Sequence, residues 1–132
     1  MPNINNRNLH GVPVNTTDAT QTVAAVVETA TDRAYLLTAK VVATETTDHD
    51  EAASYGRAAT FANDGGTVSQ VGSTTDLWTH EDTAGWDVDF NISGTDVRLR
   101  VTGAAATAVS WLVDIDVKEL GQFAANSGFG DG

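Results

Sequence analysis

The residues able to bind a metal ion or move a proton are few in this chain, and they are scattered. The three histidines, His10, His49 and His80, lie on separate segments, and no pair has a ligand spacing such as H-x-x-x-H. The chain has no cysteine, which excludes disulfides, thiolate metal sites and thiol catalysis. Solvated loop histidines are therefore the favoured interpretation over a zinc site assembled from distant segments, and we expect no metal and no cofactor.

Two acidic segments contain several possible calcium ligands. The first is Asp48-His49-Asp50-Glu51, and the second is His80-Glu81-Asp82. Calcium prefers several oxygen ligands from one loop, with a glycine at the bend and a bidentate glutamate at a fixed offset. The first segment has neither feature, so a solvated charged loop is favoured in both places.

No catalytic residue is predicted. Asp82-Thr83-Ala84-Gly85 is weakly similar to the nucleophile loop of aspartic proteases, but the residues before it are polar, whereas that chemistry needs a buried pair of carboxylates. The sequence has no G-x-S-x-G elbow, no P-loop and no G-x-G-x-x-G motif. The favoured interpretation is a turn, and we expect that the protein is not an enzyme.

The three tryptophans differ in their sequence context. Trp86 and Trp111 are in phase with apolar strand faces, which favours core packing. Trp78 precedes a polar segment, and it is the best candidate for an exposed aromatic anchor, at a protein interface or on a sugar. Burial of Trp78 under a loop is an equally weighted alternative.

Composition limits the class of protein and its partners. The length of 132 residues fits one domain, and 41% hydrophobic residues are enough for a core. The net charge of −11 repels phosphate, so we expect no binding of nucleic acid and no docking on an anionic membrane. No targeting segment is visible, and no apolar run approaches the roughly 18 residues of a membrane helix.

Apolar residues recur with a period of two, which is the spacing that places alternate side chains on one face of a sheet. The clearest segment is 109–117, followed by 97–101, 86–92 and 35–43, with weaker strands at 21–27, 54–62 and 67–74. Asn63-Asp64-Gly65-Gly66 and Ser93-Gly94-Thr95 are typical of hairpin turns. These signals predict an all-β fold: an antiparallel, jelly-roll-like β-sandwich of about seven or eight strands. The predicted inward residues are Trp86, Val88, Phe90, Val97, Leu99, Val101, Val109, Trp111, Val113 and Ile115.

The chain divides into three parts: an extended N-terminal arm over residues 1–19, a sandwich over 20–119, and a Gly-rich tail over 120–132. Phe123 and Phe129 can supply apolar contact area, and Arg7 can make a charge-assisted contact. With Trp78, these three residues are the candidate interface residues. We expect both arms to lie on another subunit and to contribute to attachment.

The ordered series of segments resembles a β-sandwich domain of tailed-bacteriophage virions, which occurs in tail fibres, spikes and head-decoration proteins. The resemblance covers roughly residues 17–118 and is based on segments 17–20, 35–43, 52–55, 64–67, 81–82, 86–88 and 97–103 and on the Trp111 strand. It implies a non-enzymatic virion structural protein, assembled in the host cytoplasm. Because the chain begins at its own Met1 and has two arms, we expect a capsid decoration (cement) protein that binds the major capsid protein or another virion protein. A tail or fibre module that binds a host glycan or another tail protein is the alternative. Analogy with such modules also implies a homo-oligomer, with a trimer as the first expectation.

Overall fold

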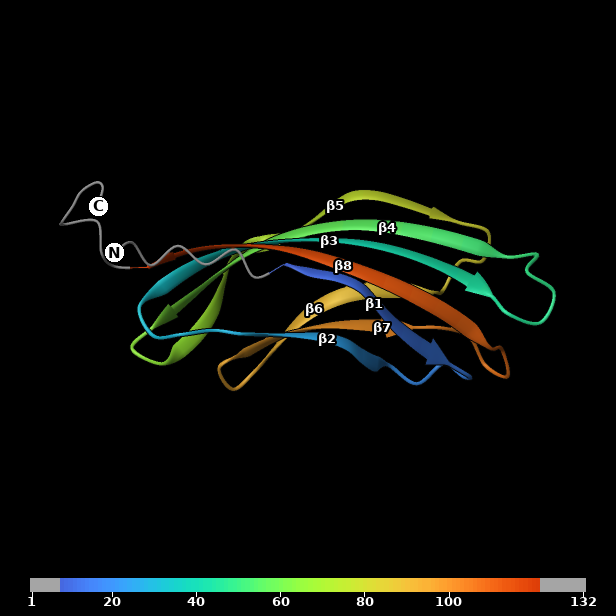
Figure 1. Ribbon diagram of the computed structural model, residues 1–132, viewed down its shortest axis with the longest axis horizontal. Helices are drawn as coiled ribbons and strands as arrows, with labels where there is room; N and C mark the ends of the chain where they lie inside the picture. Colours follow the sequence, from blue (N-terminus) through green and yellow to red (C-terminus); the bar gives the residue numbers. More distant parts are fainter. Residues whose placement is uncertain (1–7, 122–132) are drawn as a thin grey trace.

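The computed structural model describes residues 8–121, which form eight strands in two packed sheets (Figure 1). The larger sheet has five strands in the order β1-β8-β3-β4-β5, and the smaller has three in the order β2-β7-β6. All strand pairs are antiparallel, so the predicted antiparallel sandwich is confirmed. The strands are β1 (Leu9–Thr16), β2 (Thr22–Glu28), β3 (Arg33–Glu45), β4 (Ala52–Asp64), β5 (Thr67–Glu81), β6 (Asp87–Ser93), β7 (Asp96–Thr102) and β8 (Val109–Gly121).

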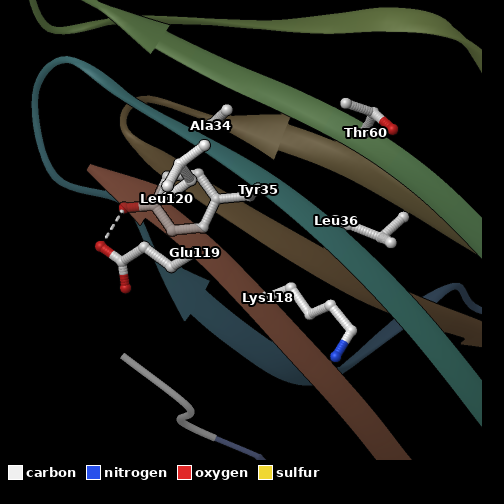
Figure 2. Close-up of a pocket in the computed structure, with 7 residues that line it drawn as sticks. All are labelled: Ala34, Tyr35, Leu36, Thr60, Lys118, Glu119 and Leu120. Carbon is white, nitrogen blue, oxygen red and sulfur yellow. Dashed lines mark hydrogen bonds between the residues drawn. The ribbon is translucent and has the colours of Figure 1, made fainter. Parts of the chain in front are cut away.

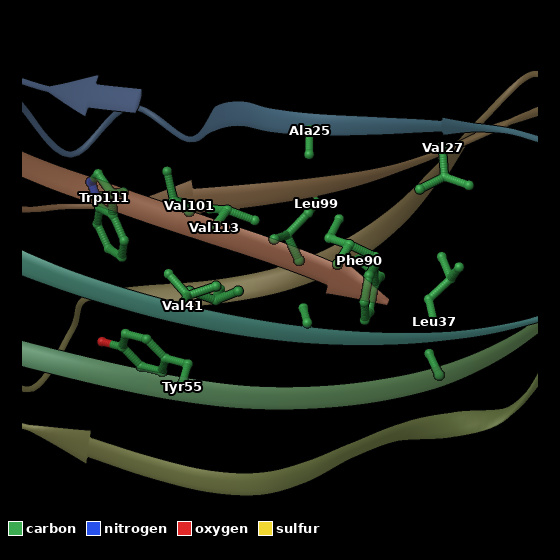
Figure 3. Packing of buried hydrophobic residues seen from close by; sticks show 14 of the residues in the cluster. Ala25, Val27, Leu37, Val41, Tyr55, Phe90, Leu99, Val101, Trp111 and Val113 are labelled. Atoms are coloured by element: carbon green, nitrogen blue, oxygen red, sulfur yellow. The ribbon is translucent and has the colours of Figure 1, made fainter. Parts of the chain in front are cut away.

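The hydrophobic core lies between the two sheets and is built from the alternate residues that the period-two pattern placed inward (Figure 3). All ten predicted inward residues are buried. The centre is aromatic: the Trp111 ring lies 6.3 Å from that of Tyr55 and 5.9 Å from that of Trp86. The core role predicted for Trp86 and Trp111 is therefore confirmed.

The N-terminal boundary of the sandwich differs from the prediction. Residues 1–19 were expected to be an irregular arm, but Leu9–Thr16 forms β1 on the edge of the larger sheet and pairs with β8. A register shift between Leu9 and Val12, with Gly11 at a φ of 63°, breaks the alternation that a sequence pattern would reveal. Pro13 is compatible with an edge strand, because such a strand leaves one row of backbone groups unpaired.

The fifth strand is also longer than predicted. The sequence indicated a strand over residues 67–74, whereas β5 continues to Glu81 and includes Trp78, which was expected to precede a loop. The register of β5 against β4 shifts twice, between Gly56 and Arg57 and between Ala58 and Thr60. Most of β5 is exposed and polar, so its sequence shows no apolar alternation.

The turns follow the sequence signals. Gly65 and Gly66 connect β4 to β5 with φ values of 62° and 95°, and Gly94 connects β6 to β7 with a φ of 62°. At the other end of the chain, β8 continues to Gly121, two residues beyond the predicted boundary at 119. Among residues 8–121, no helix is long and apolar enough to cross a membrane.

Candidate interaction face

The two sheets present very different outer faces. On the three-stranded sheet the outward cations are already paired: both carboxylate oxygens of Asp89 accept hydrogen bonds from Arg100, and Arg98 donates to the side chain of Asn91. The side-chain amide of Gln21 lies at 3.4 Å from the Asp89 carboxylate. The outer face of the three-stranded sheet is thus mainly a ladder of polar side chains bonded to one another, with Val23 and Val26 exposed on its edge strand β2.

The outer face of the five-stranded sheet is apolar by comparison. Residues directly opposite each other in an antiparallel sheet point to the same side. The register therefore places β3 and β8 residues in rows across this face, Val42 beside Leu112 and Ala34 beside Leu120. Leu112 is 47% exposed, Val42 52% and Leu120 62%. Within the part of the chain that the structure describes, no other strand covers these side chains.

Two shallow hollows lie on this face. One is formed by Ala34, Leu36, Thr60, Lys118 and Leu120 above the β4-β3-β8 end of the sheet (Figure 2). The other, towards the opposite end, is formed around Val42, Leu112 and Pro13 of β1. Both are lined mainly by carbon, which suits flat contact with a macromolecule better than enclosure of a small ligand.

Both lysines of the chain, Lys40 and Lys118, lie on this same apolar face. Within residues 8–121, neither lysine makes an ion pair or a side-chain hydrogen bond. The arginines of that region are engaged elsewhere, as Arg33 with Glu119, Arg57 with Asp76, Arg98 with Asn91 and Arg100 with Asp89. The chain has a net charge of −11, and within residues 8–121 the lysines and arginines that make no ion pair or side-chain hydrogen bond are the two lysines of this apolar surface.

Trp78 belongs to this face as well. It lies opposite Gly56, which in turn lies opposite Lys40, so the three residues form one row across β5, β4 and β3. A Cβ atom added to Gly56 would lie 2.5 Å from the Trp78 ring, so the indole packs directly against the glycine backbone. Trp78 is half-buried on the sheet surface. It is thus neither covered by a loop nor fully exposed, and part of its ring remains available for contact.

The position of Trp78 depends on Arg57, a residue that the sequence analysis did not single out. The guanidinium is buried 5.1 Å from the centre of the Tyr55 ring. Its Nη1 donates to the carbonyl of Trp78 at 2.8 Å and to that of Gly56 at 3.0 Å, while Nε donates to the carbonyl of Val88 in the other sheet. Arg57 therefore fixes β5 to β4 and ties both to β6. Its inward phase in β4, shared with Tyr55 and Phe61, is the signal that could have revealed it.

Glu45, the last residue of β3, has a structural role in the acidic loop that follows it. Oxygens of Glu45, Asp48 and Asp50 lie within 4.8 Å of one another. The Glu45 carboxylate, however, already accepts backbone N–H groups from Thr47, Asp48 and His49 at 2.8–3.2 Å. These hydrogen bonds favour the charged form and lower the pKa of Glu45. Asp48, His49 and Asp50 are exposed, in agreement with a solvated loop that Glu45 caps.

The remaining residues that the sequence analysis singled out do not converge. His10 is on β1, His49 is in the β3–β4 loop, and His80 is on β5, so the three lie on separate elements. Asp82 is exposed and accepts a hydrogen bond from the backbone N–H of Ala52 at 2.9 Å, as expected of a turn residue. The candidate interface residues Arg7, Phe123 and Phe129 lie outside the described residues.

No protein-family model matches the chain, and no curated protein matches its sequence. Among solved structures, the tailspike protein of Acinetobacter baumannii phage AM24 aligns over 92% of this chain with a TM-score of 0.48 and 12% identity. The tailspike protein of Acinetobacter phage vB_ApiP_P1 aligns over 87% with a TM-score of 0.37 and 15% identity. This chain spans about a quarter of each, 27% and 22% of their lengths.

Proposed function

We propose that this protein is a non-enzymatic structural module of a bacteriophage virion, and that it attaches to its neighbours through the outer face of the five-stranded sheet. The observation behind the assembly role is the contrast between the two outer faces. On one face the arginines are bonded to neighbouring side chains, whereas the other exposes Val42, Leu112 and Leu120 beside two lysines that make no ion pair within residues 8–121. Exposed apolar area with a few polar groups around it marks a surface that binds another macromolecule.

Within the virion, we propose capsid decoration as the position, on the basis of the resemblance of the ordered strand series to decoration and fibre modules. The partner would be the major capsid protein or another virion protein. The remainder of the strongly acidic surface would keep the protein from binding elsewhere on the particle and from binding nucleic acid.

Trp78 favours a second candidate, a tail or fibre module that binds a host-surface glycan. A half-buried indole lying against the backbone of a sheet can stack its remaining surface on the apolar face of a sugar ring. A glycan array tests this directly. Trp78→Ala should lower binding at least about tenfold, whereas Val71→Ala on the same strand should leave it unchanged. Absence of any bound glycan, or cleavage of a bound one, would contradict this candidate.

The position on the particle can be decided by counting copies. Quantitative mass spectrometry of purified particles should give hundreds of copies per particle for a decoration protein, and a few tens or fewer for a tail module. Immunogold labelling of the same particles should then mark the head or the tail. If the protein is absent from purified particles, the proposal of a virion structural role is wrong.

A further inference from the structure

We propose that the outer face of the five-stranded sheet binds the same face of a second copy of this chain, about a twofold axis that runs along the strands between β3 and β8. The inference rests on the attachment role proposed above: the neighbour that covers this face is a second copy of this chain, and the dimer would meet the capsid or another virion protein through its other surfaces. Two sheets that pack face to face keep their strands within about 30° of each other, at a separation of about 10 Å. A twofold contact uses the same residues on both subunits, so the face must be complementary to itself.

The register of β3 and β8 gives this self-complementarity. A twofold axis along the strands exchanges the two strands between copies. Each outward residue of β3 then faces, on the second copy, the residue of β8 that is its register partner within one copy. Self-association of this kind is favourable only if the two members of every row are compatible with each other.

The charged row meets this condition. Lys40 and Asp114 are register partners, so Lys40 of one copy faces Asp114 of the second, and the reverse pair forms across the axis. Lys40 makes no ion pair within the described part of its own chain. Asp114 accepts a hydrogen bond from the backbone N–H of Gly11 at 2.6 Å, which holds its carboxylate at the edge of this face. Association would therefore create two ion pairs, each with a carboxylate that is already held in place.

The two members of each apolar row are also compatible with each other. Val42 faces Leu112 of the second copy, and Ala34 faces Leu120, so the most exposed carbon side chains of the face cover one another. Leu36 faces Lys118, whose aliphatic stem can pack on it while the ammonium reaches solvent. Thr38 faces Asp116 and can donate its hydroxyl to that carboxylate.

The same chemistry explains why the three-stranded sheet is not the contact surface. Its outward arginines are already paired with Asp89 and Asn91, so contact with a second copy would require desolvating satisfied groups with no new partners. Contact through other surfaces is opposed by electrostatic repulsion, because each copy has a net charge of −11. The β3–β8 rows from Ala34 and Leu120 to Val42 and Leu112 combine apolar area with pairing of opposite charges, so a second copy fits them.

A charge exchange tests the axis itself. The twofold contact contains two Lys40–Asp114 pairs. In a Lys40→Glu dimer both pairs bring two carboxylates together, and in an Asp114→Lys dimer both pairs bring two ammonium groups together. Each variant should raise the dimer dissociation constant about tenfold or more, measured by analytical ultracentrifugation at about 0.15 M salt, where long-range repulsion is screened. An equimolar mixture of the two variants should recover wild-type affinity as a mixed dimer, since both of its contacts then pair opposite charges. Native mass spectrometry identifies that mixed dimer by its mass.

A matched pair of apolar variants gives an independent test. Leu112→Asp on the proposed contact face should yield monomers, while Val26→Asp on the outer face of the three-stranded sheet, where Val26 is 44% exposed, should leave the dimer intact. Thermal unfolding of each variant, measured under monomeric conditions, checks that the fold is retained. Equal behaviour of these two variants, or a mixture that stays monomeric, would overturn the proposed contact.

The outcomes also separate this inference from the proposed function. A wild-type protein that is monomeric at high concentration, or a trimer that persists in Lys40→Glu, would contradict the twofold contact and leave the virion role untouched. A twofold dimer that never appears on particles would contradict the virion role and leave the contact in place.

Discussion

The indole of Trp78 lies against the backbone of Gly56, the residue directly opposite it on the neighbouring strand. Any side chain at position 56 would occupy the space of the ring. The glycine therefore lets a large aromatic side chain lie flat on a sheet surface, where it shares one face with Lys40, Val42 and Leu112. The absence of a side chain at one position of β4 thus determines where the aromatic ring of the proposed interaction face lies.

We expect Gly56→Ala to displace Trp78 and to lower the free energy of unfolding by about 1–3 kcal/mol, because the added methyl group overpacks the contact. Chemical denaturation measures the stability, and a red shift of tryptophan emission reports the displaced indole. Thr60→Val, an isosteric change at an exposed position of the same strand, is the control and should alter neither quantity. Unchanged emission in Gly56→Ala would show that the indole does not depend on the glycine.

Removal of the Arg57 guanidinium should be far more costly than removal of its ion-pair partner. Arg57→Met leaves carbonyls of Gly56, Trp78 and Val88 without their donor, and we expect a loss of about 2–4 kcal/mol in the free energy of unfolding. Asp76→Asn should cost less than about 1 kcal/mol, because the Asp76 side chain is 68% exposed. Urea denaturation of both variants checks this. If the two variants lose similar amounts of unfolding free energy, then the ion pair, and not the hydrogen bonds to the carbonyls, accounts for the contribution of Arg57 to stability.

The edge strand β1 is expected to contribute to stability through Thr16. The buried Trp111 Nε1 donates to Thr16 Oγ1 at 3.0 Å. Thr16→Val keeps the shape of the side chain and removes the acceptor, so an indole N–H is left unsatisfied in the core at a cost of about 1–3 kcal/mol. Thr16→Ser, which retains the hydroxyl, should retain most of that stability. A neutral Thr16→Val variant, measured by thermal or chemical unfolding, would indicate that the hydrogen bond is replaced.

The Glu45 cap should make stability depend on acid pH. Backbone N–H groups of Asp48, Thr47 and His49 lower the pKa of Glu45 below its ordinary value of 4.5 in the folded protein. A lowered folded pKa stabilises the protein above the unfolded pKa, and that contribution is lost as the pH falls through the folded value. Thermal melting between pH 7 and pH 3 should thus show an acid decline that is shallower in Glu45→Gln. Asp64→Asn, at the end of β4, should keep the wild-type slope.

The clearly alternating strands, and the residues that they bury, follow from the amino-acid sequence alone. Segments such as 97–101 and 109–117 place every second side chain inward regardless of their neighbours, because the two-residue period is a property of the extended backbone itself. The hairpin glycines were recognisable for a similar reason, since a positive φ is a local requirement. Composition likewise identified the strong negative charge.

Which strands lie next to each other is decided only by the three-dimensional fold, and the interaction face depends on that pairing. β1 and the far half of β5 are held by hydrogen bonds to β8 and β4, and their bulges hide the alternation, so no local pattern marks them. The rows that join Lys40 to Asp114 and Val42 to Leu112 arise from pairing between residues far apart in the chain. A period of two specifies which face of a strand points outward. It does not specify which strand lies beside it, because that choice depends on the packing of the whole sandwich.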